Sequence, residues 1–169
     1  MSLDCMYIYT DASFSKNHGL AVLGYALFQN QQEHDDILLS NKNIVLSVVQ
    51  ETNNIRAEIR ASLLALQKCT ESCAVTLYTD CQNIVNLISR RSRLEKTHFV
   101  SQSSGQVLAN ADLYKEFYAL YDRMRPEVVW IKGHASKSKQ KTDKVQKNFS
   151  SLDKEVRRFL RETVVAHES

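Results

Sequence analysis

The chain has 169 residues, of which 43% are hydrophobic and 24% charged, and its formal net charge is +3. This composition excludes a disordered or collagen-like chain and is typical of a globular protein with one core, so we expect residues 1–169 to form a single domain. No apolar run approaches the ~20 residues that a membrane span needs, and the acidic N-terminus (Asp4) does not resemble a signal peptide.

The elements predicted first are three strands, over residues 6–10, 21–29 and 37–49, the last of them interrupted at residues 40–43. Their short linkers favour antiparallel neighbours. Apolar periodicity then predicts a helix over residues 55–68, for which Asn54 is a plausible N-cap. A strand over residues 74–79 and a helix over residues 82–89 follow.

The second half of the chain is less regular. Residues 90–110 have no clean period, a helix is predicted over residues 112–124, and Pro126 ends it. A strand over residues 128–131, a Lys-rich loop over residues 132–147 and a helix over residues 152–165 complete the chain. This order predicts an α/β fold: a mixed five-stranded sheet, with three antiparallel strands and then crossover units, flanked by helices.

The four cysteines are Cys5, Cys69, Cys73 and Cys81. They form no Cys-x-x-Cys pair, and no histidine stands at zinc-site spacing from them. We therefore expect free thiols in a reducing compartment, and so a cytoplasmic protein. No feature of the sequence indicates a protein partner or a membrane, and we expect a monomer.

Three acidic residues follow the pattern of a metal site. The tripeptide Tyr-Thr-Asp occurs twice, ending in Asp11 and Asp80, each time after a short β-branched run, and Glu58 lies near the start of a predicted helix. Carboxylates gathered at one sheet edge repel each other unless cations lie between them, which points to hard-metal binding and phosphate chemistry. Taken singly, Asp11 is also explained as a turn residue, Glu58 by the helix dipole and Asp80 as an N-cap.

The positive charge is concentrated near the C-terminus. Residues 132–161 hold ten Lys/Arg against three acids, so a net charge of +7 there leaves −4 for the rest of the chain. A basic region beside an acidic site suits a polyanion, whose phosphates are drawn toward metal-loaded carboxylates. A solvated helix face and loop explains the same charges equally well.

Four segments occur in one order: Tyr-Thr-Asp-Ala-Ser at residues 9–13, Thr-Asn-Asn-Ile-Arg-Ala-Glu at 52–58, Tyr-Thr-Asp-Cys-Gln at 78–82 and Lys-Gly-His at 132–134. Together they resemble ribonuclease H of type 1, over residues 6–161. The resemblance implies an endoribonuclease that cuts the RNA strand of RNA/DNA hybrids and leaves 5′-phosphate and 3′-hydroxyl ends. It also implies two Mg²⁺ ions per site, with Mn²⁺ as the alternative, held by Asp11, Glu58, Asp80 and a fourth acid on or near the last helix.

The same resemblance implies roles for other residues. The amides of Asn17, Asn54 and Gln82 would contact RNA 2′-hydroxyls, because an amide both donates and accepts hydrogen bonds. Thr52 would contact a phosphate, and His134 would assist proton transfer or product release. The segment 90–110 stands where the family has a basic substrate handle; it contains no Trp, but Arg90, Arg91 and Arg93 would hold phosphates.

Two residues compete for the role of fourth metal ligand, Asp143 and Asp153. Asp143 has the shorter spacing from His134, but no apolar neighbour before Val145 anchors it. Asp153 is expected in the first turn of a helix that apolar residues pin to the sheet, and a ligand needs rigid support. We therefore expect Asp153 to be the ligand. The other interpretation is that Asp153 and Ser150 only form a capping box.

Two other functions remain open from the sequence. A catalytically silent relative would bind nucleic acid without cutting it, although the intact acids argue against this. A DNA-directed nuclease of the same fold is the other alternative, because a fold alone does not set function. The three amides favour a site that senses ribose.

Overall fold

The computed structural model describes residues 5–133 and 143–169. Its centre is a five-stranded sheet with the strand order β3-β2-β1-β4-β5. β1 (Cys5–Ser15), β2 (Leu20–Phe28) and β3 (Val45–Gln50) are antiparallel neighbours, whereas β4 (Ala74–Thr79) runs parallel to β1 and β5 (Glu127–Trp130) parallel to β4. The predicted mixed five-stranded sheet of an α/β fold is therefore confirmed.

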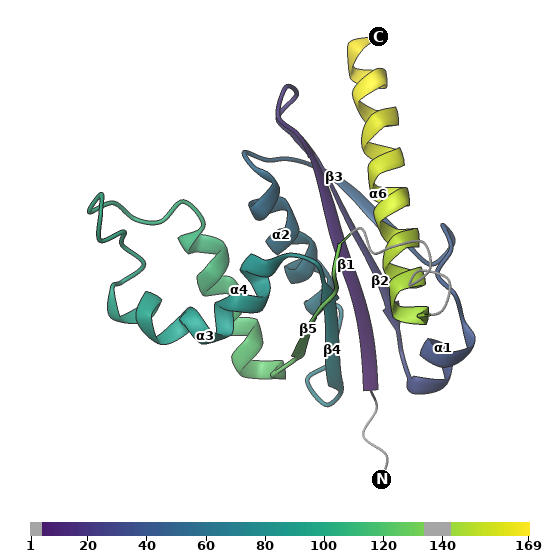
Figure 1. Cartoon of the computed structure of the whole chain (residues 1–169), viewed down its shortest axis with the longest axis horizontal. Coiled ribbons are helices and arrows are strands. Elements are labelled where there is room, and N and C mark those ends of the chain that lie inside the picture. The colour runs from purple at the N-terminus through teal and green to yellow at the C-terminus, as the bar shows by residue number, and fades with distance from the viewer. Residues whose placement is uncertain (1–4, 134–142) are drawn as a thin grey trace.

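Helices cover both faces of this sheet. α2 (Asn54–Leu66), α3 (Gln82–Lys96) and α4 (Ala111–Met124) lie on one side, and the long helix α6 (Lys144–Glu168) lies on the other, where it runs beside β1 and β2 (Figure 1). A short helix, α1 (Gln31–Asp36), connects β2 to the turn before β3. None of the helices in the described part of the chain has the length and apolarity that a bilayer crossing demands.

The central strand β1 is buried on both of its faces, because its side chains alternate between two cores. Ile8 packs with Leu63 of α2 and Phe117 of α4, whereas Tyr9 packs with Leu152 and other residues of α6. Ile8 and Tyr9 are both fully buried. This double burial gives the middle of the sheet a rigid position from which side chains can project.

α6 approaches the sheet closely at Gly24. A Cβ atom at this position would lie 2.3 Å from Val156 Cγ2 and 3.1 Å from Leu152 Cδ1. Gly24 pairs with Asp11 across the β1–β2 ladder. The missing side chain at residue 24 therefore lets α6 rest on the sheet beside Asp11.

Several predicted boundaries were wrong. The strand expected over residues 37–49 is confined to β3, and α1 was missed because its sequence is polar and buries only His34. Residues 41–43 form a turn in which the Asn43 N–H donates to the Ser40 carbonyl. α3 continues past residue 89 to Lys96, with Leu94 as the buried residue of its last turns.

The last helix begins eight residues before its predicted start and shortens the expected Lys-rich loop. Asp143 is the N-cap of α6, and its carboxylate accepts from the Val145 and Gln146 N–H groups. Phe149 is buried in the core between α6 and the sheet, which holds this added length of helix in place. In agreement with the sequence, none of the four cysteines, all of them among the described residues, is joined in a disulfide.

Candidate metal centre

The two Tyr-Thr-Asp copies lie side by side in matching register. β1 and β4 are parallel, and their last paired residues are Tyr9 and Tyr78, whose rings stack with centroids 4.7 Å apart. Asp11 and Asp80 each follow two residues later, so the two strands deliver both carboxylates to the same level of the sheet. The two copies of the tripeptide therefore occupy equivalent positions on two neighbouring strands.

Asp11 does not end its strand as predicted. β1 continues to Ser15, and Asp11 pairs with Gly24 inside the β1–β2 ladder, which excludes the interpretation of Asp11 as a turn residue. Asp11 is 3% exposed and Glu58, in α2, is 6% exposed. One carboxylate oxygen from each of Asp11, Glu58 and Asp80 lies within 4.8 Å of the other two.

The alternative structural roles of Glu58 and Asp80 are also contradicted. The first turn of α2 contains no acidic residue, and Glu58 lies in the second turn, away from the dipole end. The N-cap of α3 is Cys81, not Asp80. Helix stability alone therefore does not account for these two carboxylates.

The cluster is electrostatically costly without a cation. Burial raises the pKa of Asp11 well above its ordinary value, and the charges of Asp80 and Asp153 raise it further. Burial likewise raises the pKa of Glu58, with added repulsion from Asp11 and Asp80. A divalent cation would remove this repulsion, because it supplies positive charge where the carboxylates converge.

Two orphan atoms test whether this cluster fits a metal. Asp11 Oδ2 and Glu58 Oε2 are buried and have no hydrogen-bond partner. A buried carboxylate oxygen without a partner is strongly unfavourable, whereas a bound cation satisfies it. Carboxylate oxygens are also the donors that Mg²⁺ and Mn²⁺ prefer, so the residues fit a hard divalent cation.

α6 brings a fourth carboxylate toward the cluster. The charge of Asp153 contributes to the raised pKa of Asp11, which places Asp153 within electrostatic reach of it. The Arg157 Nε–H donates to Asp153 Oδ1 at 2.6 Å, one helical turn away. The charges of Asp153, Asp11 and Asp80 all raise the pKa of Arg157, so its guanidinium is a cation in the field of these acids.

The structure separates the two candidates for the fourth ligand. Asp143 is exposed and caps α6. Asp153 lies in the interior of α6, not in its first turn as predicted, and the capping box with Ser150 is wrong because the helix has already begun at Lys144. The apolar residues expected to pin Asp153 do so, since Leu152 and Val156 are fully buried against the sheet.

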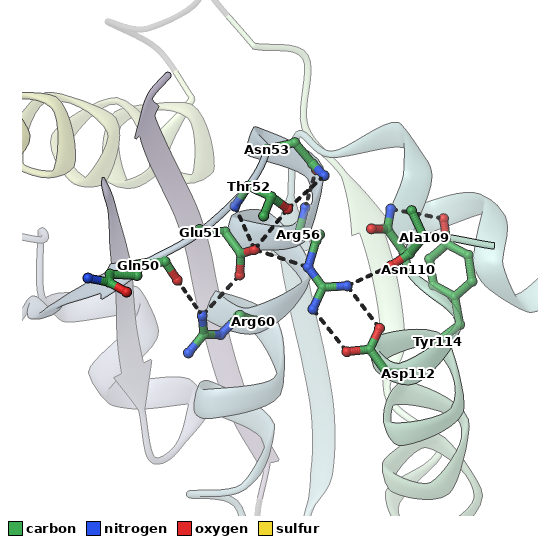
Figure 2. A network of polar contacts seen from close by, with 10 residues as sticks. All are labelled: Gln50, Glu51, Thr52, Asn53, Arg56, Arg60, Ala109, Asn110, Asp112 and Tyr114. Atoms are coloured by element: carbon green, nitrogen blue, oxygen red, sulfur yellow. Dashed lines mark hydrogen bonds and ion pairs between the residues drawn. The ribbon is translucent and has the colours of Figure 1, made fainter. Parts of the chain in front are cut away.

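A polar network fixes the start of α2, the helix that carries Glu58, and Figure 2 shows this network. Glu51 accepts from Arg56 Nε at 3.0 Å and from Arg60 Nη1 at 2.9 Å, and Arg56 also forms a two-pronged pair with Asp112 of α4 at 2.8 and 2.9 Å. Burial acts to raise the pKa of Glu51, but the Thr52 N–H and the two arginines lower it overall, so its carboxylate stays charged. The network thus ties the end of β3 to α2 and α4.

Known proteins with similar sequences indicate one family. The RNase H family model matches residues 4–151. The chain is 34% identical to Ribonuclease HI of Haemophilus influenzae over 128 residues, which cover 76% of this chain and 77% of the relative. It is 30% identical to Ribonuclease H of Rippkaea orientalis over 129 residues (76% and 74%) and to Ribonuclease HI of Neisseria meningitidis serogroup B (strain MC58) over 130 residues (77% and 83%).

The chain belongs to the RNase H family. This confirms the resemblance drawn from the sequence motifs. RNase H enzymes are metal-dependent hydrolases that act on the RNA of RNA/DNA hybrids, and the acidic cluster gives this chain a group suited to hold the metal. The family match ends at residue 151 and so does not cover Asp153.

In this RNase H chain the three predicted amides lie on three different elements. Asn54 is the first residue of α2 and donates to Glu58 Oε1 at 3.5 Å; the N-cap is Asn53, not Asn54 as predicted, because Asn53 accepts from the Arg56 N–H. Gln82 is the first residue of α3, two residues after Asp80. Asn17 is exposed in the turn between β1 and β2.

Thr52 and the predicted arginines have different surroundings. Thr52 is exposed directly before the Asn53 cap, and its N–H donates to Glu51. Arg91 pairs with Asp122 and Glu95 and lies over the Tyr118 ring, so its charge is largely balanced. Arg90 lies over the Tyr114 ring and, with Arg93, lines a hollow of about 280 Å³ at the end of α3.

Two further residues remain to be placed, Cys81 and the predicted His134. Burial, together with the charge of Glu58, raises the pKa of the Cys81 thiol to about 11, so it is protonated near neutral pH and unsuited to act as a nucleophile. The predicted His134 lies outside the described residues. Sequence reasoning missed Glu51 and Arg157; only the i, i+4 spacing of Asp153 and Arg157 signalled the second.

Proposed function

We propose that this RNase H chain hydrolyses the RNA strand of RNA/DNA hybrids with two Mg²⁺ ions held by Asp11, Glu58, Asp80 and Asp153, and leaves 5′-phosphate and 3′-hydroxyl ends. The observation that carries the proposal is the convergence of Asp11, Glu58 and Asp80 within 4.8 Å, with one orphan buried oxygen on each of the first two. The fourth ligand is supported by the influence of Asp153 on the pKa of Asp11.

Cations held by these four carboxylates would lower the pKa of a bound water and stabilise the charge on the leaving oxygen. The protein itself holds the ligand side chains in fixed positions. Asp11 is held inside a doubly buried strand, and Glu58 is held by a helix whose first turn is fixed through Glu51 and Asn53. Ligands placed on such rigid elements keep their geometry without reorganisation during the reaction.

Selection of the RNA strand rests on the three amides in this proposal. Asn54 lies one helical turn before Glu58, and Gln82 follows Asp80 by two residues, so both stand next to metal ligands. A 2′-hydroxyl donates and accepts at once, and an amide matches it in both roles. Asn17, Thr52, Arg90 and Arg93 would extend the contact along the duplex, whereas Arg91 is already paired within the protein.

Further parts of the proposal come from the sequence. His134 would take part in proton transfer or product release, as the Lys-Gly-His motif implies. Mg²⁺ is proposed over Mn²⁺, and the chain is proposed to work as a monomer in the cytoplasm. These assignments stay predictions that the described residues do not test.

A cleavage assay on matched duplexes tests the proposed function. We expect Mg²⁺-dependent cutting of the RNA strand in labelled RNA/DNA, and none of RNA/RNA or DNA/DNA. Asp80→Asn should remove nearly all turnover while circular dichroism and melting temperature show a folded protein. Cutting of DNA/DNA would favour the DNA-directed alternative, and binding without cutting by the wild type would favour a silent relative.

A further inference from the structure

Of the three clustered acids, Asp80 has the least support from secondary structure. Asp11 lies within β1 and Glu58 within α2, and both are buried, whereas Asp80 is half-buried on the two-residue link between β4 and α3. The Cys81 N–H donates to Thr79 Oγ1 at 3.1 Å, a contact that holds the backbone of this link. A metal ligand works only within about 0.5 Å of its required position.

The end of β5 contacts this link through its backbone and through an indole. Trp130 is the register partner of Thr79, and the Ile131 N–H donates to the Thr79 carbonyl at 2.9 Å. One residue further on, the Trp130 indole N–H donates to the Asp80 carbonyl oxygen at 3.3 Å. The Trp130 ring remains 47% exposed, so burial in the core does not account for its position.

The same segment also lies against the Asp80 carboxylate. A Cβ atom on Gly133 would be 2.7 Å from Asp80 Oδ2, closer than real Cβ contacts come. Gly133 is not among the glycines with positive φ, which are Gly19 and Gly105, so an alanine there would meet no backbone strain. A side chain at residue 133 would therefore occupy the space that the Asp80 carboxylate now fills.

We propose that Trp130 and Gly133 are positioning residues that orient the Asp80 carboxylate toward the metal; this inference rests on the proposed function, in which Asp80 is a ligand. The Asp80 carbonyl belongs to the rigid peptide plane that follows its Cα, so the indole contact restricts ψ of Asp80 and the direction of its Cα–Cβ bond. Because Gly133 has no side chain, it leaves space for Asp80 Oδ2 when the Asp80 side chain points in this direction.

Metal binding without substrate tests this inference. Calorimetric titration with Mn²⁺ should show about three- to tenfold weaker binding for Trp130→Phe, which keeps a ring but loses the donor, since one hydrogen bond has about this value. Gly133→Ala should weaken binding more. In turnover assays the Mg²⁺ dependence of kcat should move to higher concentration by the same factors, with an unchanged KM for the hybrid at saturating Mg²⁺.

Trp130 also gives a direct optical readout, because it is the single tryptophan of the chain. We expect its emission in the wild type to change on Mn²⁺ addition with the midpoint found by calorimetry, and to lose that response in Asp80→Asn. An emission that ignores Mn²⁺ while calorimetry records binding would overturn the coupling between Trp130 and the site.

Val128→Ala is the matched control, because Val128 lies on the same face of β5 as Trp130 and packs against the core. It should lower the melting temperature and leave Mn²⁺ affinity unchanged. If Asp80→Asn binds Mn²⁺ like the wild type, the proposed metal site itself fails. If Asp80→Asn loses the metal while Trp130→Phe and Gly133→Ala bind it like the wild type, only the positioning role is overturned.

Discussion

At the scale of single residues, the proposed metal ligand Asp11 lowers the stability of the folded protein when no cation is bound. Its carboxylate is buried beside other acids, and one of its oxygens has no hydrogen-bond partner. We expect Asp11→Asn to lose nearly all turnover and, in EDTA at neutral pH, to melt higher than the wild type. A gain of 1 kcal/mol corresponds to about 2–4 °C for a chain of this size. Differential scanning fluorimetry with and without Mg²⁺ measures both states.

The pH dependence of this effect has a definite sign. Because burial and neighbouring charges raise the pKa of Asp11 in the folded state, the folded protein keeps a proton that the unfolded chain has lost. The unfolding free energy of the metal-free wild type therefore falls as pH rises from the ordinary pKa of 3.8 through the raised value. The advantage of Asp11→Asn should grow over that window; parallel melting curves for the two proteins between pH 4 and 8 would contradict it.

The two candidates for the fourth ligand, Asp143 and Asp153, should respond differently to substitution. Asp143 caps α6, so Asp143→Ala is expected to cost about 1 kcal/mol of stability and leave the Mg²⁺ requirement unchanged. Asp153→Asn should raise the Mg²⁺ requirement or lower turnover sharply with little loss of stability. Mg²⁺ titrations and melting curves on both variants distinguish the roles, and impairment of only the Asp143 variant would exclude Asp153 as the ligand.

At the scale of elements, the contact between α6 and β2 sets where Asp153 stands. Gly24→Ala would place a Cβ 2.3 Å from Val156 Cγ2, and overpacking of this kind costs about 1–3 kcal/mol. We expect a lower melting temperature together with a raised Mg²⁺ requirement, because α6 must move away from Asp11. Adding Val156→Ala to Gly24→Ala should restore part of both losses, and a strictly additive double variant would show that the two residues are not in contact.

The elements that could be predicted from the sequence are those whose pattern is strongly periodic. The Tyr-Thr-Asp strands and α2 show alternating or helical apolar positions, and they were placed correctly apart from their ends. α1 buries only His34, and beyond its Asn30 cap its support comes from tertiary contacts: the His34 ring stacks on Tyr7, and Leu39 beyond the helix donates its N–H to Asn148 of α6. Contacts between residues so far apart in the chain leave no local signal.

At the scale of the whole molecule, the site could be predicted in part for a similar reason. Asp11 and Asp80 carry the same flanking residues because each follows a paired tyrosine of two neighbouring parallel strands by two residues. The repeat therefore predicted that the two carboxylates lie close together. The fourth ligand depended on where α6 begins, which is set by the Asp143 cap and by packing at Phe149. The proposed positioning residues Trp130 and Gly133 lie against Asp80 on the link between β4 and α3, and no spacing in the sequence predicts such a contact.

The positive charge of the chain is concentrated in one region, which would favour the first encounter with the phosphates of a hybrid. Residues 132–161 carry a net charge of +7 in a chain of +3. If this region attracts the hybrid, binding should weaken as salt rises, with each neutralised phosphate contributing about 0.7–0.9 to the log–log slope. Changing Lys137, Lys139 and Lys141 together to Ala should therefore flatten the slope.

The matched control for this last experiment removes the same charge from the far end of the sheet. Lys68 follows α2, Arg123 lies near the end of α4 and Arg125 precedes β5, whose first residue, Glu127, pairs with Thr76, four residues before Asp80. Changing Lys68, Arg123 and Arg125 to Ala lowers the net charge equally, but at the end of the sheet away from the acids. Salt titrations of hybrid binding, in Ca²⁺ to suppress cutting, should give a flatter slope for the first triple variant only. Equal slopes for the two variants would mean that net charge, and not the basic region, draws in the substrate.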